Sequence, residues 1–349
     1  MRIHEDFTGG NIVVKEQVGS TVVLDNELRD TVGDWFYWAF CIEGAQGATL
    51  TFRFPENRLG YSGPAVSHDL KEWHWLGAGE ENSFTYRFAE DETKVYFAHH
   101  LLYHPDRFFA FAQENALAVS ELCKSRRGRS VPCVHLGDGD RSIILTARHH
   151  ACESTGDYVL EGVLKELTAA PIAHTHILAV PFVDYDGVVD GDQGKGRAPH
   201  DHNRDYDPDS TPLYPEVAAI RTYAAHNGCH YGFDFHSPWH KGGENDRVFI
   251  VRNSIEKQAR FDRFSALLER ALTPNAMHYS SADDRLPMTG WNQPKPTFGY
   301  SMMDRPECDL AFTLESTYFG TAENPVTCER LVALGVCFAK ALKSYLGEN

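Results

Sequence analysis

The stretch Ser142-Ile-Ile-Leu-Thr-Ala-Arg-His-His-Ala-Cys-Glu153 joins an apolar run of strand length to two histidines and a glutamate. A helix-forming pattern follows it, at about 155–168. An apolar strand that leads into an amphipathic helix is typical of a parallel sheet with helices on both faces, and ligands of such sheets bind beyond the carboxyl ends of the strands. The stretch therefore predicts an α/β fold and a site close to His150 and Glu153.

The same alternation continues to the end of the chain. We expect further strands at 175–183, 231–235, 248–251 and 310–314, and further helices at 215–226, 254–272 and 325–346. Strand-sized apolar runs separated by helical periodicity indicate an α/β domain. Residues 116–349 are therefore predicted to form a mixed, largely parallel sheet covered by helices.

A different pattern precedes this domain. Over residues 1–115, short segments alternate apolar and polar residues between Gly, Asn and Asp turns, as in 20–24, 48–54 and 83–88. A period of two with this punctuation predicts an antiparallel β-sandwich domain. We expect a helix at about 114–124 after it, and we interpret the basic stretch 124–130 as a solvated connector between the two domains.

Composition excludes several classes of protein. The 349 residues include 33 basic and 49 acidic residues, a net charge of −16, which opposes binding to nucleic acid or to an anionic membrane surface. No apolar run approaches the roughly 18 residues of a membrane span. The first residues are acidic rather than signal-like, and the eight cysteines form no CxxC pair, so we expect a cytoplasmic protein with reduced thiols.

Candidate metal ligands lie at strand ends. His150 and Glu153 are three residues apart, so one helical turn can direct both toward the same point, and His236 ends the strand predicted at 231–235. Either feature alone has an ordinary explanation: a chance HxxE match, or a hydrogen-bonded structural histidine. Together, three nitrogen and oxygen ligands suit a catalytic zinc with one position left for water.

Two more features belong to the same region. The segment 190–206 is polar, glycine-rich and longer than an ordinary connection, which indicates either a functional loop or a solvated one. Glu315 directly follows the apolar strand 310–314. A carboxylate in that position is costly unless it is solvated, paired or functional.

These motifs resemble a known family. The HxxE, the DxNR at 201–204, the DFH ending at His236 and the TLES at 313–316 occur in the order found in the zinc carboxypeptidases. The segments GGNI, YWAF and GPAVSHD of the N-terminal part are similar to the cytosolic carboxypeptidase branch and its bacterial relatives. The resemblance implies one Zn²⁺ per chain, held by His150, Glu153 and His236.

The resemblance also implies roles for the polar loop and the last strand. Asp201 would orient the first ligand histidine, Asn203 and Arg204 would grip the terminal carboxylate of the substrate, and Glu315 would be the general base. For the group that stabilises the oxyanion we choose Arg197 over Lys195.

Tyr300 is the candidate for the tyrosine that caps the substrate. The implied reaction is hydrolysis of the C-terminal bond of a peptide or protein tail. A zinc deacylase acting on N-acyl amino acids and a catalytically silent peptide-binding protein are the alternatives. The preferred side chain and the oligomeric state stay open.

Overall fold

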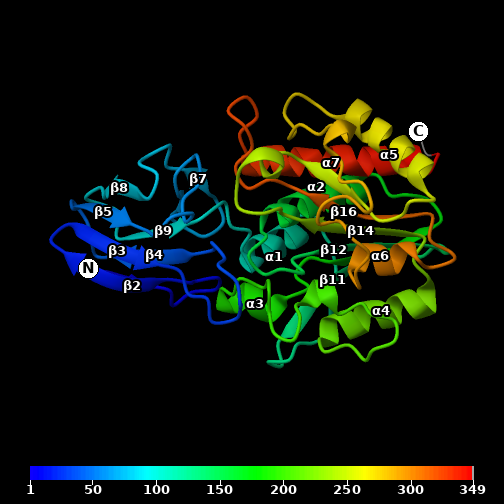
Figure 1. Ribbon diagram of the computed structural model, residues 1–349, viewed down its shortest axis with the longest axis horizontal. Helices are drawn as coiled ribbons and strands as arrows, with labels where there is room; N and C mark the ends of the chain where they lie inside the picture. The colour runs from blue at the N-terminus through cyan, green and yellow to red at the C-terminus, as the bar shows by residue number, and fades with distance from the viewer. Residues whose placement is uncertain (348–349) are drawn as a thin grey trace.

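The computed structural model describes residues 1–347 of the chain. Nine short N-terminal strands lie beside a sheet that is covered by helices (Figure 1). No helix within residues 1–347 combines the length and the apolar character needed to cross a membrane.

The helix-covered sheet has seven strands in the order β10-β11-β13-β12-β14-β16-β15. The four central strands, β13, β12, β14 and β16, run parallel, and the outer pairings are antiparallel. The sheet is thus mixed with a parallel centre, as predicted. Its strands are β10 (Val119–Lys124), β11 (Ser130–Gly137), β12 (Arg141–Ala147), β13 (Thr175–Val180), β14 (Tyr231–His236), β15 (Phe249–Arg252) and β16 (Leu310–Glu315).

Helices cover both faces of this sheet (Figure 1). Above it in the view lie α2 (Thr155–Ala169), α5 (Gln258–Ala271) and α7 (Cys328–Tyr345), and below it lie α3 (Tyr185–Asp190) and α4 (Pro215–Asn227). The remaining helices are α1 (Pro105–Glu114) and α6 (Phe298–Met303), with short 3₁₀ turns at His202–Arg204, Gly243–Asp246 and Ser281–Asp283.

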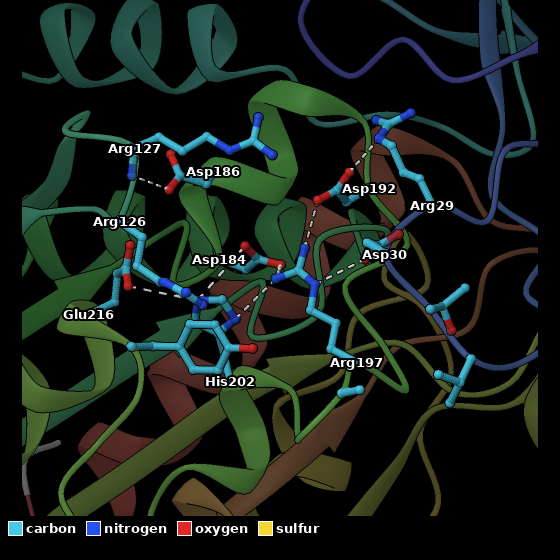
Figure 2. A pocket seen from close by; sticks show the side chains of 14 residues that line it. Arg29, Asp30, Arg126, Arg127, Asp184, Asp186, Asp192, Arg197, His202 and Glu216 are labelled. Atoms are coloured by element: carbon cyan, nitrogen blue, oxygen red, sulfur yellow. Dashed lines mark hydrogen bonds and ion pairs between the residues drawn. The ribbon is translucent and has the colours of Figure 1, made fainter.

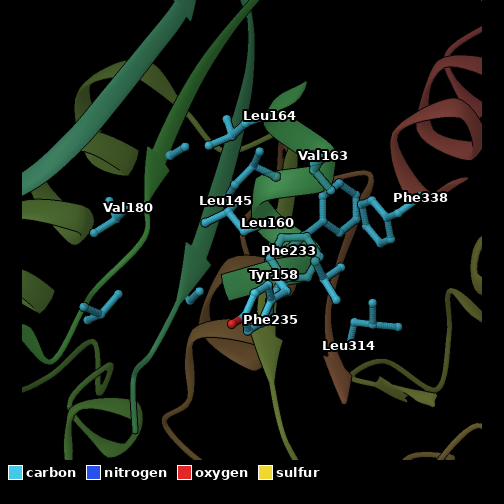
Figure 3. Close-up of a cluster of buried hydrophobic side chains, with 14 of the residues drawn as sticks. Leu145, Tyr158, Leu160, Val163, Leu164, Val180, Phe233, Phe235, Leu314 and Phe338 are labelled. Atoms are coloured by element: carbon cyan, nitrogen blue, oxygen red, sulfur yellow. The ribbon is translucent and has the colours of Figure 1, made fainter. Parts of the chain in front are cut away.

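The core fills the space between the sheet and these helices. Phe233 and Phe235 of β14 pack among side chains of α2 and against Phe338 of α7 (Figure 3). Helices α2 and α7 can cross closely because residue 162 is a glycine. A Cβ at Gly162 would lie 2.0 Å from the carbonyl oxygen of Val332. This packing fixes the sheet, and with it the strand ends that carry the predicted site.

The N-terminal strands form two sheets, ordered β1-β4-β9-β6-β7 and β2-β3-β5-β8. Aromatic residues of both sheets, among them Phe40, Phe52 and Phe97, share one buried cluster. The strands are β1 (Arg2–His4), β2 (Val13–Val18), β3 (Thr21–Asp25), β4 (Ala39–Glu43), β5 (Thr49–Arg53), β6 (Ala65–Ser67), β7 (His74–Trp75), β8 (Ser83–Arg87) and β9 (Lys94–Ala98).

Two expectations about this half need correction. The strands are not all antiparallel: β3 and β5 pair in parallel, because the chain passes through β4 in the other sheet between them. The helix expected at 114–124 is also wrong, since α1 ends at Glu114 and Val119–Lys124 is strand β10.

The basic stretch is not a domain connector. It forms the turn between the antiparallel strands β10 and β11, and the guanidinium of Arg129 forms ion pairs with Asp186 and Asp190. The pairing of β10 with β11 explains why residues 119–124 form a strand in spite of their helical pattern. The boundary between residues 115 and 116 stays a prediction.

Candidate metal centre and substrate cavity

The three predicted metal ligands meet at the carboxyl ends of β12 and β14. The Nδ1 atom of His150 lies 2.9 Å from Oε1 of Glu153, and Nδ1 of His236 lies 2.6 Å from Oε2 of the same carboxylate. All three side chains are buried, and their ligand atoms lie within 4.8 Å of one another. Two imidazole nitrogens and one carboxylate are a donor set that suits zinc in a catalytic site.

A carboxylate lies on the far side of each imidazole, within hydrogen-bond distance of His236 and farther from His150. Nε2 of His236 lies 2.6 Å from Oδ2 of Asp234, and Nε2 of His150 lies 3.5 Å from Oδ1 of Asp201. A carboxylate on Nε2 keeps the proton there and leaves Nδ1 free for a metal. Burial alone would raise the pKa of Asp234, but His149 and His236 hold it below the usual range.

Sequence reasoning gave Asp201 this role and missed Asp234. The missed signal is the spacing of Asp234 and His236, which are two residues apart and therefore on one face of strand β14. Asp234 is held in turn by the hydroxyl of Thr146, which donates to Oδ1 at 2.8 Å, and it lies 2.8 Å from Nδ1 of His149.

Glu315 lies beside this cluster because of strand register. His236 and Glu315 are paired residues of the parallel strands β14 and β16, so their side chains project on the same face of the sheet. Oε2 of Glu315 is buried and has no hydrogen-bond partner among residues 1–347. Burial raises the pKa of Glu315 to about 7, which suits a group that exchanges protons near neutrality.

A cavity of about 230 Å³ opens onto the cluster. Its lining includes His150, Lys195, Asn203, Arg204, His236, Trp239, Trp291, Lys295, Tyr300 and Glu315. Within residues 1–347, no carboxylate oxygen lies within 4.0 Å of the Arg204 guanidinium, which donates only to the carbonyl of Asn203. The cavity thus offers an uncommitted cation that can receive an anionic group.

Asn203 and Tyr300 line the same cavity. Nδ2 of Asn203 lies 3.3 Å from Nε2 of His236, and its Oδ1 accepts from the backbone N–H of Phe298. The Tyr300 hydroxyl donates to Oδ1 of Asn292 at 3.0 Å. The structure thus brings both predicted substrate contacts to the cavity wall.

Arg197 lies elsewhere. Its guanidinium faces a separate cavity of about 580 Å³ (Figure 2), where it forms ion pairs with Asp30, Asp184 and Asp192 at 2.7–3.0 Å. The cation beside the cluster is instead Lys195, whose Nζ lies 2.7 Å from Oε1 of Glu153. The choice of Arg197 over Lys195 as the group at the metal is therefore not supported, because three carboxylates hold Arg197 away from it.

Comparisons with known proteins bear on this geometry. No protein-family model matches the chain. An uncharacterized protein of Zymomonas mobilis subsp. mobilis is 27% identical over 257 residues, which cover 68% of this chain and 67% of that protein.

Solved structures are more informative about the fold. A metallo-carboxypeptidase from Burkholderia cenocepacia matches with a TM-score of 0.80 and 20% identity, over 99% of this chain and 98% of its own. A metallo-carboxypeptidase from Pseudomonas aeruginosa matches with a TM-score of 0.79 and 19% identity, over 99% of both chains. The chain therefore has the fold of the bacterial metallo-carboxypeptidases, and the predicted resemblance is confirmed at that level.

Proposed function

We propose that this protein is a zinc metallocarboxypeptidase that hydrolyses the C-terminal peptide bond of peptides or protein tails. The observation that carries the proposal is the convergence of Nδ1 of His150, Nδ1 of His236 and the carboxylate of Glu153 on one buried point. The Asp234 carboxylate on the far nitrogen of His236, and the Asp201 carboxylate 3.5 Å from that of His150, support a metal site rather than a structural hydrogen-bond cluster.

Side chains around this point have complementary tasks. The chemistry that zinc supplies when bound is Lewis-acid activation of a water and of the scissile carbonyl. Glu315 accepts a proton from the attacking water and delivers it to the leaving amine, a role that its buried, unpartnered oxygen permits. Lys195 places a positive charge next to the reacting carbonyl, where it stabilises the developing negative charge on oxygen.

Recognition of the chain end falls to Arg204 and Asn203. The free guanidinium of Arg204 can form paired hydrogen bonds with a terminal carboxylate, and Asn203 lies next to it at the cavity wall. The related enzyme from Pseudomonas aeruginosa was solved in complex with (2-guanidinoethylmercapto)succinic acid, a ligand with two carboxylates. A dicarboxylate is compatible with a cavity that is lined by two of the predicted metal ligands and by the Arg204 guanidinium.

A zinc deacylase of N-acyl amino acids is the second candidate. A small cavity favours it, because about 230 Å³ is below the usual range for ligand pockets, roughly 300–1,000 Å³. A catalytically silent binding protein is less compatible with an unpaired base beside a complete ligand set.

One assay separates these functions. Zinc-loaded protein is incubated with a peptide pool and with a pool of N-acyl amino acids, and products are identified by mass spectrometry. Release of single C-terminal residues supports the carboxypeptidase. Hydrolysis of the acyl pool alone identifies a deacylase, and no product from either pool in the presence of bound zinc indicates a silent homologue.

A further inference from the structure

A segment of the N-terminal half reaches the polar loop 190–206, which contains Lys195. The segment 26–38 connects β3 to β4, and its Asp30 side chain is only 10% exposed. The Asp30 carboxylate accepts hydrogen bonds from the backbone N–H groups of Gln193 and Gly194 at 3.0 and 2.8 Å, and from Nε of Arg197 at 3.0 Å. One carboxylate therefore binds the loop on both sides of Lys195.

Other groups of the same segment reinforce this contact. The backbone N–H of Tyr37 donates to the side-chain oxygen of Gln193 at 3.0 Å, and the Gln193 amide returns a hydrogen bond to the Tyr37 carbonyl at 2.8 Å. The backbone N–H of Val32 donates to the carbonyl of Gly196 at 3.1 Å. The loop residues on both sides of Lys195 are thus hydrogen-bonded to this segment.

Trp35 lies directly over the lysine. Nζ of Lys195 lies 5.0 Å from the centre of the Trp35 ring, within the range of a cation–π contact. Since the same Nζ lies 2.7 Å from Glu153, the ammonium is held between an aromatic face and a predicted metal ligand. Trp35 also contacts Trp239 of the cavity wall, with ring centres 4.9 Å apart.

The opposite side of the loop packs on the metal-binding turn. Gly194 has φ +75°, and a Cβ there would lie 2.0 Å from the backbone nitrogen of Ala151, next to His150. The backbone N–H of Cys152 donates to the carbonyl of Gln193 at 3.2 Å. The loop is therefore enclosed between the N-terminal segment and the turn that carries His150 and Glu153.

We propose that Asp30 and Trp35 are positioning residues of the active site, which hold the Lys195 ammonium at Glu153 and so make the N-terminal half a working part of the catalytic centre. This proposal rests on the proposed function for its kinetic consequences. The contacts of Asp30 and Trp35 with the loop can be tested without substrate.

The matched variants are Asp30→Asn and Asp34→Asn. Asp34 lies in the same segment, is 72% exposed and pairs with Arg58, so its loss leaves the loop contacts in place. We expect Asp30→Asn to keep one zinc per chain and to lower kcat about ten- to a hundredfold with little change in KM, since a displacement of about 1 Å can cost that much. Asp34→Asn should behave as the unmodified protein.

A double-mutant cycle tests whether Asp30 acts through Lys195. In a Lys195→Ala background, Asp30→Asn should lower kcat by less than about threefold, because the group it positions is already absent. An equal loss in both backgrounds, or equal behaviour of Asp30→Asn and Asp34→Asn, would overturn the proposal.

Amide hydrogen exchange gives a readout that is independent of activity. In Asp30→Asn, the peptide that contains Gln193 and Gly194 should exchange faster, whereas Asp34→Asn leaves its exchange unchanged. If the unmodified protein hydrolyses no substrate, the proposed function fails, but the exchange comparison still tests whether Asp30 holds the loop.

Should Asp30→Asn not fold, Trp35→Phe and Trp35→Leu replace it. The phenylalanine variant keeps an aromatic face and should keep most of kcat, whereas the leucine variant should not. Equal kcat in both variants contradicts the role of the ring.

Discussion

Asp234 determines which nitrogen of His236 faces the predicted metal site. Its carboxylate lies 2.6 Å from Nε2, so the proton stays on that nitrogen and Nδ1 is available toward Glu153. An asparagine would keep the size of the side chain but lose the charge that polarises the ring.

We therefore expect a graded loss of metal from two variants. His236→Ala removes a ligand and should leave folded protein without stoichiometric zinc. Asp234→Asn should bind zinc about 10- to 100-fold more weakly, the usual effect of losing such an outer carboxylate. Metal content by plasma mass spectrometry, with affinity measured by competition against a chelator, checks both. A full zinc equivalent in His236→Ala would refute the ligand assignment.

In the proposed mechanism, turnover depends on Glu315. Glu315→Gln keeps the shape of the side chain but cannot accept a proton, so turnover should fall at least about 10²-fold while metal content stays the same. Because burial raises the pKa of Glu315 to about 7, the deprotonated fraction of Glu315 increases as the pH rises through neutrality. In the unmodified enzyme kcat/KM should therefore increase from about pH 6 to about pH 8, and the residual activity of Glu315→Gln should lack this rise.

Arg204 should discriminate a free chain end from a blocked one. Amidation of the substrate removes the terminal charge and leaves the scissile bond intact, which should cost about 2 to 3 kcal/mol of charge-assisted hydrogen bonding. That corresponds to a loss of roughly thirty- to a hundred-and-sixty-fold in kcat/KM. The ratio of acid to amide hydrolysis is the quantity to measure. Arg204→Ala should have a low kcat/KM on both substrates, with little difference between the free acid and the amide. Equal rates on the free acid and the amide in the unmodified enzyme would favour an amidase or deacylase.

At the scale of elements, burial explains which predictions were right. Strands β12, β14 and β16 are buried along almost their whole length, so they appear in the sequence as continuous apolar runs and were predicted to within a residue or two. Their parallel pairing then places His150, His236 and Glu315 at one edge. The clustering of the predicted ligands was predictable for this reason.

Elements that depend on partners far along the chain were not predictable. Strand β10 is largely exposed and has a helical pattern, and only its pairing with β11 makes it a strand. Lys195 and Arg197 are two residues apart in a glycine-rich loop without periodicity, and Asp30, some 160 residues earlier, pairs with Arg197 and binds the backbone of Gln193 and Gly194. Sequence alone contains no signal for that contact.

The crossing of α2 and α7 gives a prediction at this scale. A Cβ at Gly335 would lie 1.9 Å from the carbonyl oxygen of Val159, so alanine forces the helices apart. We expect Gly335→Ala to lower the free energy of unfolding by about 1–3 kcal/mol, although alanine is the better helix former. Urea titration with an unchanged m-value checks this. Lys340→Ala, at an exposed position of the same helix, should change stability by less than about 0.5 kcal/mol.

The two halves of the molecule share more than the Asp30 contact. The largest buried cluster contains Tyr37, Trp73 and Ala98 of the N-terminal half together with the core of the helix-covered sheet. The indole N–H of Trp75 donates to the carbonyl of Val326 at 2.8 Å, and the side chain of Asn11 donates to the carbonyl of Gly191 at 2.7 Å. A continuous core with such cross-contacts is unlike the polar, separable interface that is usual between domains of one chain.

The protein should therefore unfold as one cooperative unit. Scanning calorimetry of the zinc-loaded protein should give a single transition whose calorimetric and van't Hoff enthalpies agree, because melting of the N-terminal half would expose the shared cluster. If the predicted ligands bind zinc more tightly in the folded state, its removal by a chelator should lower the Tm of that single transition. Two separate peaks, with only the second sensitive to chelator, would show that residues 1–115 and 116–349 are independent domains. In that case Asp30 and its neighbours would form a contact between separable units. The kinetic loss expected for Asp30→Asn would then have to be measured below the temperature at which the first transition begins, where the N-terminal half is still folded.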